Sequence, residues 1–151
     1  MSRRRARELA FRILFQMDVG GTDPELAFDR SLAEAPLPVE EVEFARDLVQ
    51  GVWEKRRSLD AIIQESAVDW SLERMARVDI NLLRLALYEM YYRDDIPVGV
   101  SINEVVELAK RYSTSESGKF INGILGNLAR RKTGSRPDSE REGKEPDPVT
   151  G

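Results

Sequence analysis

Apolar residues recur along most of this chain every three or four positions, which is the spacing of one face of an α-helix. The first such stretch predicts a helix over residues 3–19, which ends at the pair Gly20 and Gly21. Its apolar face consists of Ala6, Leu9, Ala10, Ile13, Leu14 and Met17. No stretch of useful length alternates with a period of two, apart from a weak one at 98–102. The pattern therefore predicts an all-α protein with about seven helices.

Three further helices are predicted before the centre of the chain. A short helix begins at Pro24, directly after a capping side chain, and runs to about Ala35. A third helix covers the apolar positions of residues 42–53. We interpret Arg56–Ser58 as a break, after which Ser58 caps a fourth helix.

The helix predicted from Val78 to Arg93 has apolar positions almost all the way round, which is typical of a central helix. Arg84 interrupts this apolar surface. We expect it to lie on an edge of the helix and to pair with a carboxylate such as Asp79 or Glu104.

Two more helices follow, each with a recognisable start. Ser101 opens a capping-box pattern with a glutamate three positions later, and Ser115 or Ser117 is expected to cap the final helix. Gly123 and Gly126 lie inside that final helix, where each costs about 1 kcal/mol relative to alanine. We expect close helix packing at Gly126. At Gly123, packing and the approach of a ligand both remain open.

The composition indicates one soluble domain. With 151 residues, of which 41% are hydrophobic and 33% charged, the chain can bury a core of its own. We predict a helical domain over residues 1–132 and a disordered tail over 133–151, where Val149 is the one large aliphatic residue. The chain has no run of 18 or more apolar residues, so we expect no membrane contact. We interpret the basic start as a helix of the mature protein and not as a signal peptide, and we expect a cytoplasmic protein.

Cysteine and histidine are both absent from the sequence. Their absence excludes disulfides, thiolate nucleophiles, a histidine general base and zinc sites with the usual nitrogen or sulfur ligands. A Gly-rich phosphate-binding loop is missing as well. We therefore predict a non-catalytic protein that needs no cofactor and no metal.

Positive charge is concentrated at the start of a chain whose net charge is −4. Arginines occupy positions 3, 4, 5, 7 and 12, and Glu8 is the one acid among them. Cations at a helix N-terminus oppose the helix dipole, so helix stability does not explain this cluster. Arginine offers a planar fork to phosphates and stacks on bases. The cluster therefore predicts RNA binding.

A second polar and basic region covers residues 112–119, at the turn between the last two helices. Lys110 and Arg111 precede it, and Asn122 should share a helix face with Lys119. By itself this region would be an ordinary, well-capped helix corner. We expect it to lie beside the arginine cluster, so that the two form one cationic surface.

Four strings cover most of residues 3–128: RRRARELAFRILFQMD, VDINLLRLALYEM, IPVGVSINEVVELAKRYS and SGKFINGILGNL. Together and in this order, they resemble the NusB family of bacterial transcription antitermination factors. The segments SINEVVELAK and KFINGIL are the specific part of the resemblance.

The resemblance implies a fold of two small helical bundles packed together. It implies binding of single-stranded boxA-type RNA from ribosomal operon leaders, jointly with the ribosomal protein NusE, in an RNA polymerase antitermination complex. The RNA-contacting positions would be Arg3, Arg4, Arg5, Arg7, Phe15, Tyr112, Glu116, Ser117, Lys119, Phe120 and Asn122. The NusE-facing positions would be Asp79, Arg84 and Phe15. Phe15 stands where many members carry tyrosine, and so lacks a hydroxyl.

Two other interpretations remain open from the sequence. One is a NusB-like accessory domain of a ribosomal RNA methyltransferase system; the other is a helical adaptor or homodimer without an RNA role. About four phosphate contacts would give a slope of about −3 when log affinity is plotted against log salt. We expect replacement of Arg3, Arg4, Arg5 and Arg7 by glutamine to flatten this slope while the fold persists.

Overall fold

In the computed structural model, the described residues are 3–67 and 72–131, and they form helices without a β-strand. The all-α prediction is confirmed, with one α-helix fewer than predicted. The predicted tail lies outside the described residues. None of the helices in the described part is long and apolar enough to cross a membrane. The elements are α1 (Arg3–Gly20), α2 (Pro24–Glu34), α3 (Val39–Ser66), the 3-10 turn η1 (Leu72–Arg74), α4 (Arg77–Tyr92), α5 (Val98–Tyr112) and α6 (Ser115–Arg131).

Helix α3 is continuous over 28 residues, so the predicted break at Arg56–Ser58 is wrong. The guanidinium of Arg56 lies 3.9 Å from the centroid of the Trp53 ring and also donates to the Trp53 carbonyl, so this polar side chain folds back along its own helix. Beyond it, Leu59 and Ile63 are fully buried and continue the apolar face. Polar residues here are the exposed side of one long helix.

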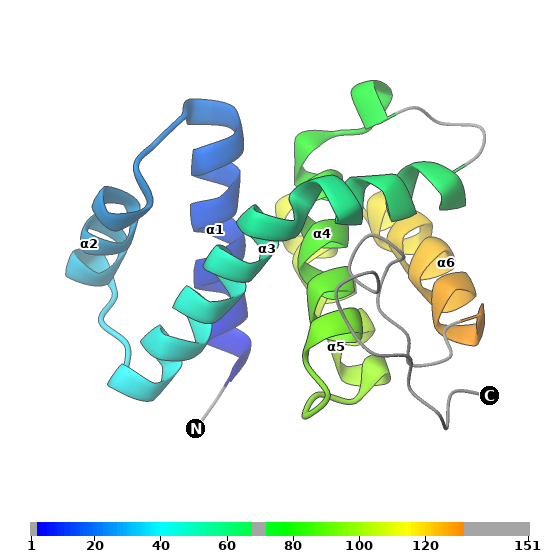
Figure 1. The fold of residues 1–151 in the computed structure, drawn as a ribbon. Coiled ribbons are helices and arrows are strands. Elements are labelled where there is room, and N and C mark those ends of the chain that lie inside the picture. Colours follow the sequence, from blue (N-terminus) through cyan, green and yellow to red (C-terminus); the bar gives the residue numbers. More distant parts are fainter. Residues whose placement is uncertain (1–2, 68–71, 132–151) are drawn as a thin grey trace.

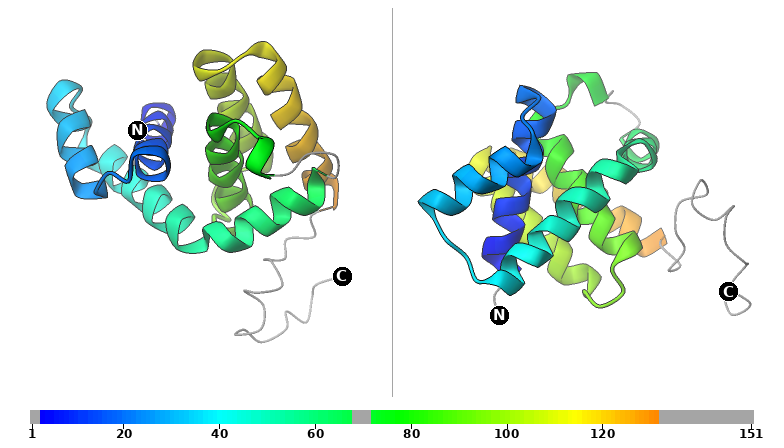
Figure 2. Two further views of the ribbon diagram at one scale, coloured as in Figure 1. Left: turned by 90° about the horizontal axis from the view of Figure 1, so that it is seen from above. Right: turned by 60° about the vertical axis from the view of Figure 1, so that its left-hand side comes forward.

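The helices form two bundles that share α3 (Figure 1). Helices α1 and α2 pack on the first half of α3, whereas α4, α5 and α6 gather at its second half (Figure 1). Seen from above, α3 follows a curved path beneath both groups (Figure 2). This arrangement agrees with the two bundles that the family resemblance implies.

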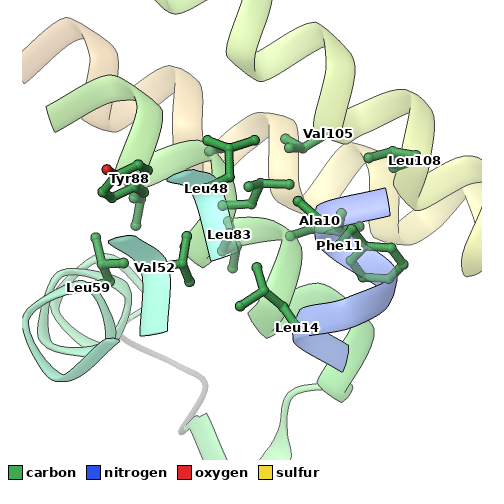
Figure 3. Close-up of a cluster of buried hydrophobic side chains, with 14 of the residues drawn as sticks. Ala10, Phe11, Leu14, Leu48, Val52, Leu59, Leu83, Tyr88, Val105 and Leu108 are labelled. Carbon is green, nitrogen blue, oxygen red and sulfur yellow. The ribbon is translucent and has the colours of Figure 1, made fainter. Parts of the chain in front are cut away.

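Helix α4 is central, as predicted, and every residue from Asp79 to Met90 is buried. Side chains from α1, α3, α4 and α5 meet in one apolar cluster, which includes Leu14, Leu48, Leu83 and Val105 (Figure 3). The two bundles therefore bury one shared core.

The side chain of Tyr88 on α4 packs directly against Gly51 on α3. A Cβ atom on this glycine would lie 2.1 Å from Cζ of Tyr88, which is far inside van der Waals contact. Tyr88 is itself buried and stacks on Tyr92, with ring centroids 5.5 Å apart. The ring of Tyr88 occupies the space that a side chain at position 51 would need.

The start signals of the last two helices were predicted at the wrong residues. Helix α5 begins three residues before Ser101, at Val98, and Ser101 is buried with its hydroxyl donating to Glu89 Oε1 at 2.6 Å. The Ser101 hydroxyl, which was expected to cap the helix, is thus bonded to Glu89 of α4 instead. At α6 the capping side chain is Thr114, whose Oγ1 accepts from the Ser117 amide at 3.0 Å.

Gly123 and Gly126 of α6 face open space or a flexible side chain within the described residues. The atom nearest to a Cβ at Gly126 would be Nη1 of Arg130, at 3.7 Å, so the predicted close packing at Gly126 is wrong. No atom lies within 4 Å of a Cβ at Gly123. Neither glycine is required by helix packing.

Candidate nucleic-acid interface

The start of α1 lies beside the second half of α5, and a groove of about 910 Å³ runs between them. The arginine cluster thus shares a groove with Lys110 and Arg111, whereas Thr114, Glu116 and Ser117 of the predicted second region line a separate hollow. The cations that line the groove are Arg4, Arg5, Arg7, Lys110 and Arg111. Its carboxylates are Glu8, Glu104 and Glu107.

Arg3, Arg4 and Arg5 are all paired with carboxylates from other helices or loops. Arg4 forms a two-point contact with Glu104, at 3.1 and 3.0 Å, although 74% of its side chain is exposed. Nη2 of Arg5 lies 3.3 Å from Glu41, and Nη1 of Arg3 lies 3.2 Å from an oxygen of the Asp95 side chain. These ion pairs tie the start of α1 to other parts of the fold, so the arginine cluster has a structural role that its unfavourable position in the helix dipole did not reveal.

Arg7 differs from its neighbours because its side chain is only 3% exposed. Its Nε and Nη2 donate to the two oxygens of Glu89, at 2.8 and 3.1 Å, and Ser101 completes this buried network. The guanidinium of Arg7 does not face solvent, so its predicted role as a phosphate contact does not fit its position. A variant that replaces Arg7 together with the other arginines should also lose stability, contrary to the expectation from the sequence.

Tyr112 and Arg111 meet Glu8 where α5 crosses α1. The Tyr112 hydroxyl donates to Glu8 Oε2, and Arg111 Nη1 donates to Glu8 Oε1 at 3.1 Å. The Tyr112 ring packs on Phe11, with centroids 5.1 Å apart, and 37% of the residue remains exposed. Burial, and then the hydrogen bond to Glu8, raise the pKa of Tyr112 above its ordinary value. Phe15 is half-buried on the same helix, 6.2 Å from Phe11.

The corner between α5 and α6 presents Glu116, Lys119 and Asn122 as exposed side chains. Lys119 Nζ lies 3.9 Å from Glu116, and both are highly exposed, so this ion pair is weak. Ser117 is half-buried and points inward, with Oγ donating to Asp79 Oδ2 at 3.3 Å.

A second hollow, of about 320 Å³, lies between η1, the start of α4 and this corner. Apolar atoms of Met75, Ala76 and Phe120 line it, and Asp79 contributes the buried carboxylate. Within the described residues, Oδ1 of Asp79 has no hydrogen-bond partner. Burial raises the pKa of Asp79, and the Ser117 hydrogen bond partly offsets this. The hollow therefore has at its wall a carboxylate with an unused acceptor atom that is itself buried.

Arg84 is buried, and its predicted partners Asp79 and Glu104 are wrong. Its Nε and Nη2 donate to the two oxygens of Asp60 on α3, at 2.7 and 2.8 Å, and Nη1 lies 3.9 Å from Asp18. Arg84 joins α4 to both α3 and α1 and does not reach the surface as a direct partner contact.

Sequence reasoning missed Glu8 as the acid that organises the crossing of α1 and α5. A clue was available, since Glu8 is the one acid among the first twelve residues and lies one helical turn after Arg4. Its partners could not be known, because they lie more than 100 residues away along the chain.

Comparison with known proteins identifies the family. The chain is 48% identical over 137 residues to the transcription antitermination protein NusB of Desulforamulus reducens, covering 91% of this chain and 96% of that protein. Its fold matches the solved T. maritima NusB with a TM-score of 0.79 and 37% identity, covering 95% and 99% of the two chains. It also matches, with a TM-score of 0.78 and 29% identity, a chain in a crystal structure of antitermination factors NusB and NusE with double-stranded RNA, covering 87% and 100%. The NusB family profile matches residues 4–130, and the chain therefore belongs to the NusB family.

Proposed function

We propose that this protein binds single-stranded boxA-type RNA of ribosomal operons in the groove between α1 and α5, as a non-catalytic transcription antitermination factor. The observation that carries the proposal is that two basic segments, about 100 residues apart in the chain, line one groove. The solved relative with NusE and double-stranded RNA supports RNA as the ligand, without regard to strandedness.

The proposed RNA surface follows the exposed cations along α1 and α5 and continues onto the corner. Arg7 lines the floor of the groove, but its guanidinium is buried against Glu89, so it is not among the proposed contacts. The proposed contacts are Arg3, Arg4, Arg5, Phe15, Lys110, Arg111, Tyr112, Glu116, Ser117, Lys119 and Asn122.

We propose that a NusE partner docks at the second hollow, with Asp79 as acceptor and Phe15 at the edge of the contact. The unused Oδ1 of Asp79 supports this, because a buried acceptor is costly until a donor reaches it. Arg84 acts there by fixing α4 through Asp60. The protein would enter the RNA polymerase antitermination complex through this partner.

RNA affinity should depend on salt through the exposed groove cations. Three of them, Arg4, Arg5 and Lys110, give an expected slope of about −2 in log affinity against log salt, since each phosphate contact contributes about −0.7 with single strands. Changing Arg4 and Arg5 to glutamine should reduce the slope to about −0.7. Fluorescence titrations of single-stranded boxA-type, scrambled and duplex oligonucleotides at several salt concentrations measure this.

The matched control removes two exposed arginines from other faces, Arg30 on α2 and Arg57 on α3, by the same change to glutamine. The control variant has the same net charge as the groove variant and should keep the wild-type slope. Equal slopes for the groove variant and the wild type would refute the proposed site. If the protein were only a protein-interaction adaptor, it would bind the boxA-type, scrambled and duplex oligonucleotides equally at every salt concentration.

A NusE partner should raise RNA affinity, because it extends a surface whose cations are already paired with carboxylates. We expect a mixture of the two proteins to bind the boxA-type oligonucleotide at least about tenfold tighter than this protein alone, which corresponds to about 1.4 kcal/mol. Changing Asp79 to asparagine should reduce this gain and leave the affinity without NusE unchanged. No gain from NusE with the unchanged protein would contradict the proposal.

A further inference from the structure

We propose that Glu8 is a specificity-determining residue of the groove: it holds Tyr112 as a stacking surface for a base and keeps Arg111 from binding phosphate freely. RNA would then be selected at this crossing by its bases more than by its charge. The inference rests on the proposed RNA-binding function and assigns it a residue with a distinct role.

Glu8 uses its two carboxylate oxygens on two different side chains of α5. Oε1 accepts from Arg111 and Oε2 accepts from the Tyr112 hydroxyl. The side chain of Glu8 is only 20% exposed, so this contact is partly shielded from solvent and from salt. One acid thus fixes both a cation and an aromatic ring.

The ring of Tyr112 is held at two points. Phe11 supports it from the side of α1, and the hydrogen bond to Glu8 fixes its hydroxyl end. More than a third of the residue is still exposed. A base can stack on such a prepared ring without ordering it first, which favours binding of an unpaired base.

Arg111 is the exposed cation at the same crossing, with 68% of its side chain accessible. A phosphate that takes the Nη1 group of Arg111 must displace Glu8, and movement of the Glu8 carboxylate also releases the Tyr112 hydroxyl from its acceptor. Phosphate binding and the stacking surface therefore compete. An RNA that binds only through its phosphates gains the contact with Arg111 and loses the stacking surface of Tyr112.

Glu107 provides a matched control within the same groove. It pairs with Lys110 at 3.5 Å, both side chains are more than half exposed, and Glu107 has no hydrogen bond to Tyr112. Changing Glu107 to glutamine removes the same charge from the same groove but leaves Tyr112 and Arg111 in place.

The test compares Glu8→Gln, Glu107→Gln and Tyr112→Phe in the full chain. Each is titrated with a single-stranded boxA-type oligonucleotide and with a scrambled oligonucleotide of the same composition, at several salt concentrations. Urea unfolding midpoints establish that each variant is folded under the conditions of the titration.

We expect Glu8→Gln to bind the scrambled oligonucleotide about threefold tighter, with a salt slope steeper by about 0.7, and not to tighten on the boxA-type oligonucleotide. The ratio of the two affinities should fall by about threefold. Glu107→Gln should tighten both and preserve the ratio. Tyr112→Phe should lower the ratio without changing the slope, because it removes the hydroxyl and no charge.

An affinity ratio that is the same for Glu8→Gln and Glu107→Gln would overturn the inference, since Glu8 would then act as a charge alone. An unchanged ratio in Tyr112→Phe would overturn it as well. Failure of the unchanged protein to bind either oligonucleotide would instead refute the proposed function, so the two failures are distinguishable.

Discussion

Replacing Arg7 with methionine is expected to lower the free energy of unfolding by about 3–5 kcal/mol, because it leaves the carboxylate of Glu89 buried without its ionic partner. Both side chains are almost fully buried, at 3% and 1% exposure, and they form two hydrogen bonds with each other. Ser101 donates to the same carboxylate and cannot neutralise it. Chemical denaturation followed by circular dichroism measures the loss.

Lys110 provides the control for this change. Its pair with Glu107 is exposed on both sides, at 52% and 64%, and replacement of Lys110 by methionine should cost no more than about 1 kcal/mol. Changing Glu89 to glutamine in the Arg7→Met protein should recover part of the lost stability, because the uncompensated charge is then gone. A loss at Arg7 as small as the loss at Lys110 would show that the buried pair contributes little.

Gly51→Ala is expected to destabilise the protein by about 3 kcal/mol, at the upper end of what an added methyl group costs in a packed core. The new Cβ would be 2.1 Å from Cζ of Tyr88. The ring of Tyr88 has little room to retreat, because it stacks on Tyr92 and its hydroxyl lies 3.5 Å from Asp47. Thermal and denaturant unfolding report the change.

Gly123→Ala is the matched control, since this glycine is also inside a helix but has no atom within 4 Å of a Cβ. There the same substitution should stabilise the protein by about 0.5–1 kcal/mol through helix propensity. In a Tyr88→Ala background, Gly51→Ala should lose most of its cost. Equal effects at positions 51 and 123 would contradict the close approach of α3 and α4.

The sequence predicts α1 and α4 well because their own periodicity determines them. Helix α1 has one clear apolar face, and α4 is apolar almost all round because it is buried from Asp79 to Met90. Such patterns need no knowledge of distant residues. The all-helical fold follows from the same local information.

The prediction failed in α3 because this helix passes from one bundle to the other. Its buried face continues from Val52 to Leu59, two turns later, but no residue between them is buried, and this polar stretch resembles a loop in the sequence. The start of α5 was misplaced for a related reason, since Ser101 has a capping pattern in the sequence but a buried carboxylate partner in the fold.

The basic groove was predictable, but its internal pairing was not. Positions of cations follow from the sequence, whereas Glu104 and Glu8 reach Arg4 and Tyr112 across 100 and 104 residues of chain. Burial of Arg7 is likewise a tertiary property. An arginine that supports the fold and one that faces a ligand look alike in the sequence.

The continuous course of α3 has a consequence for recognition. One wall of the groove, α1, belongs to the first bundle, and the other, α5, belongs to the second, while α3 underlies both (Figure 2). Helix α3 thereby fixes the distance between the two walls of the groove before any ligand binds. Helix α3 is unbroken between the two bundles. The two walls of the groove therefore do not need to close around the nucleic acid, and binding does not lose the conformational entropy that domain closure would cost.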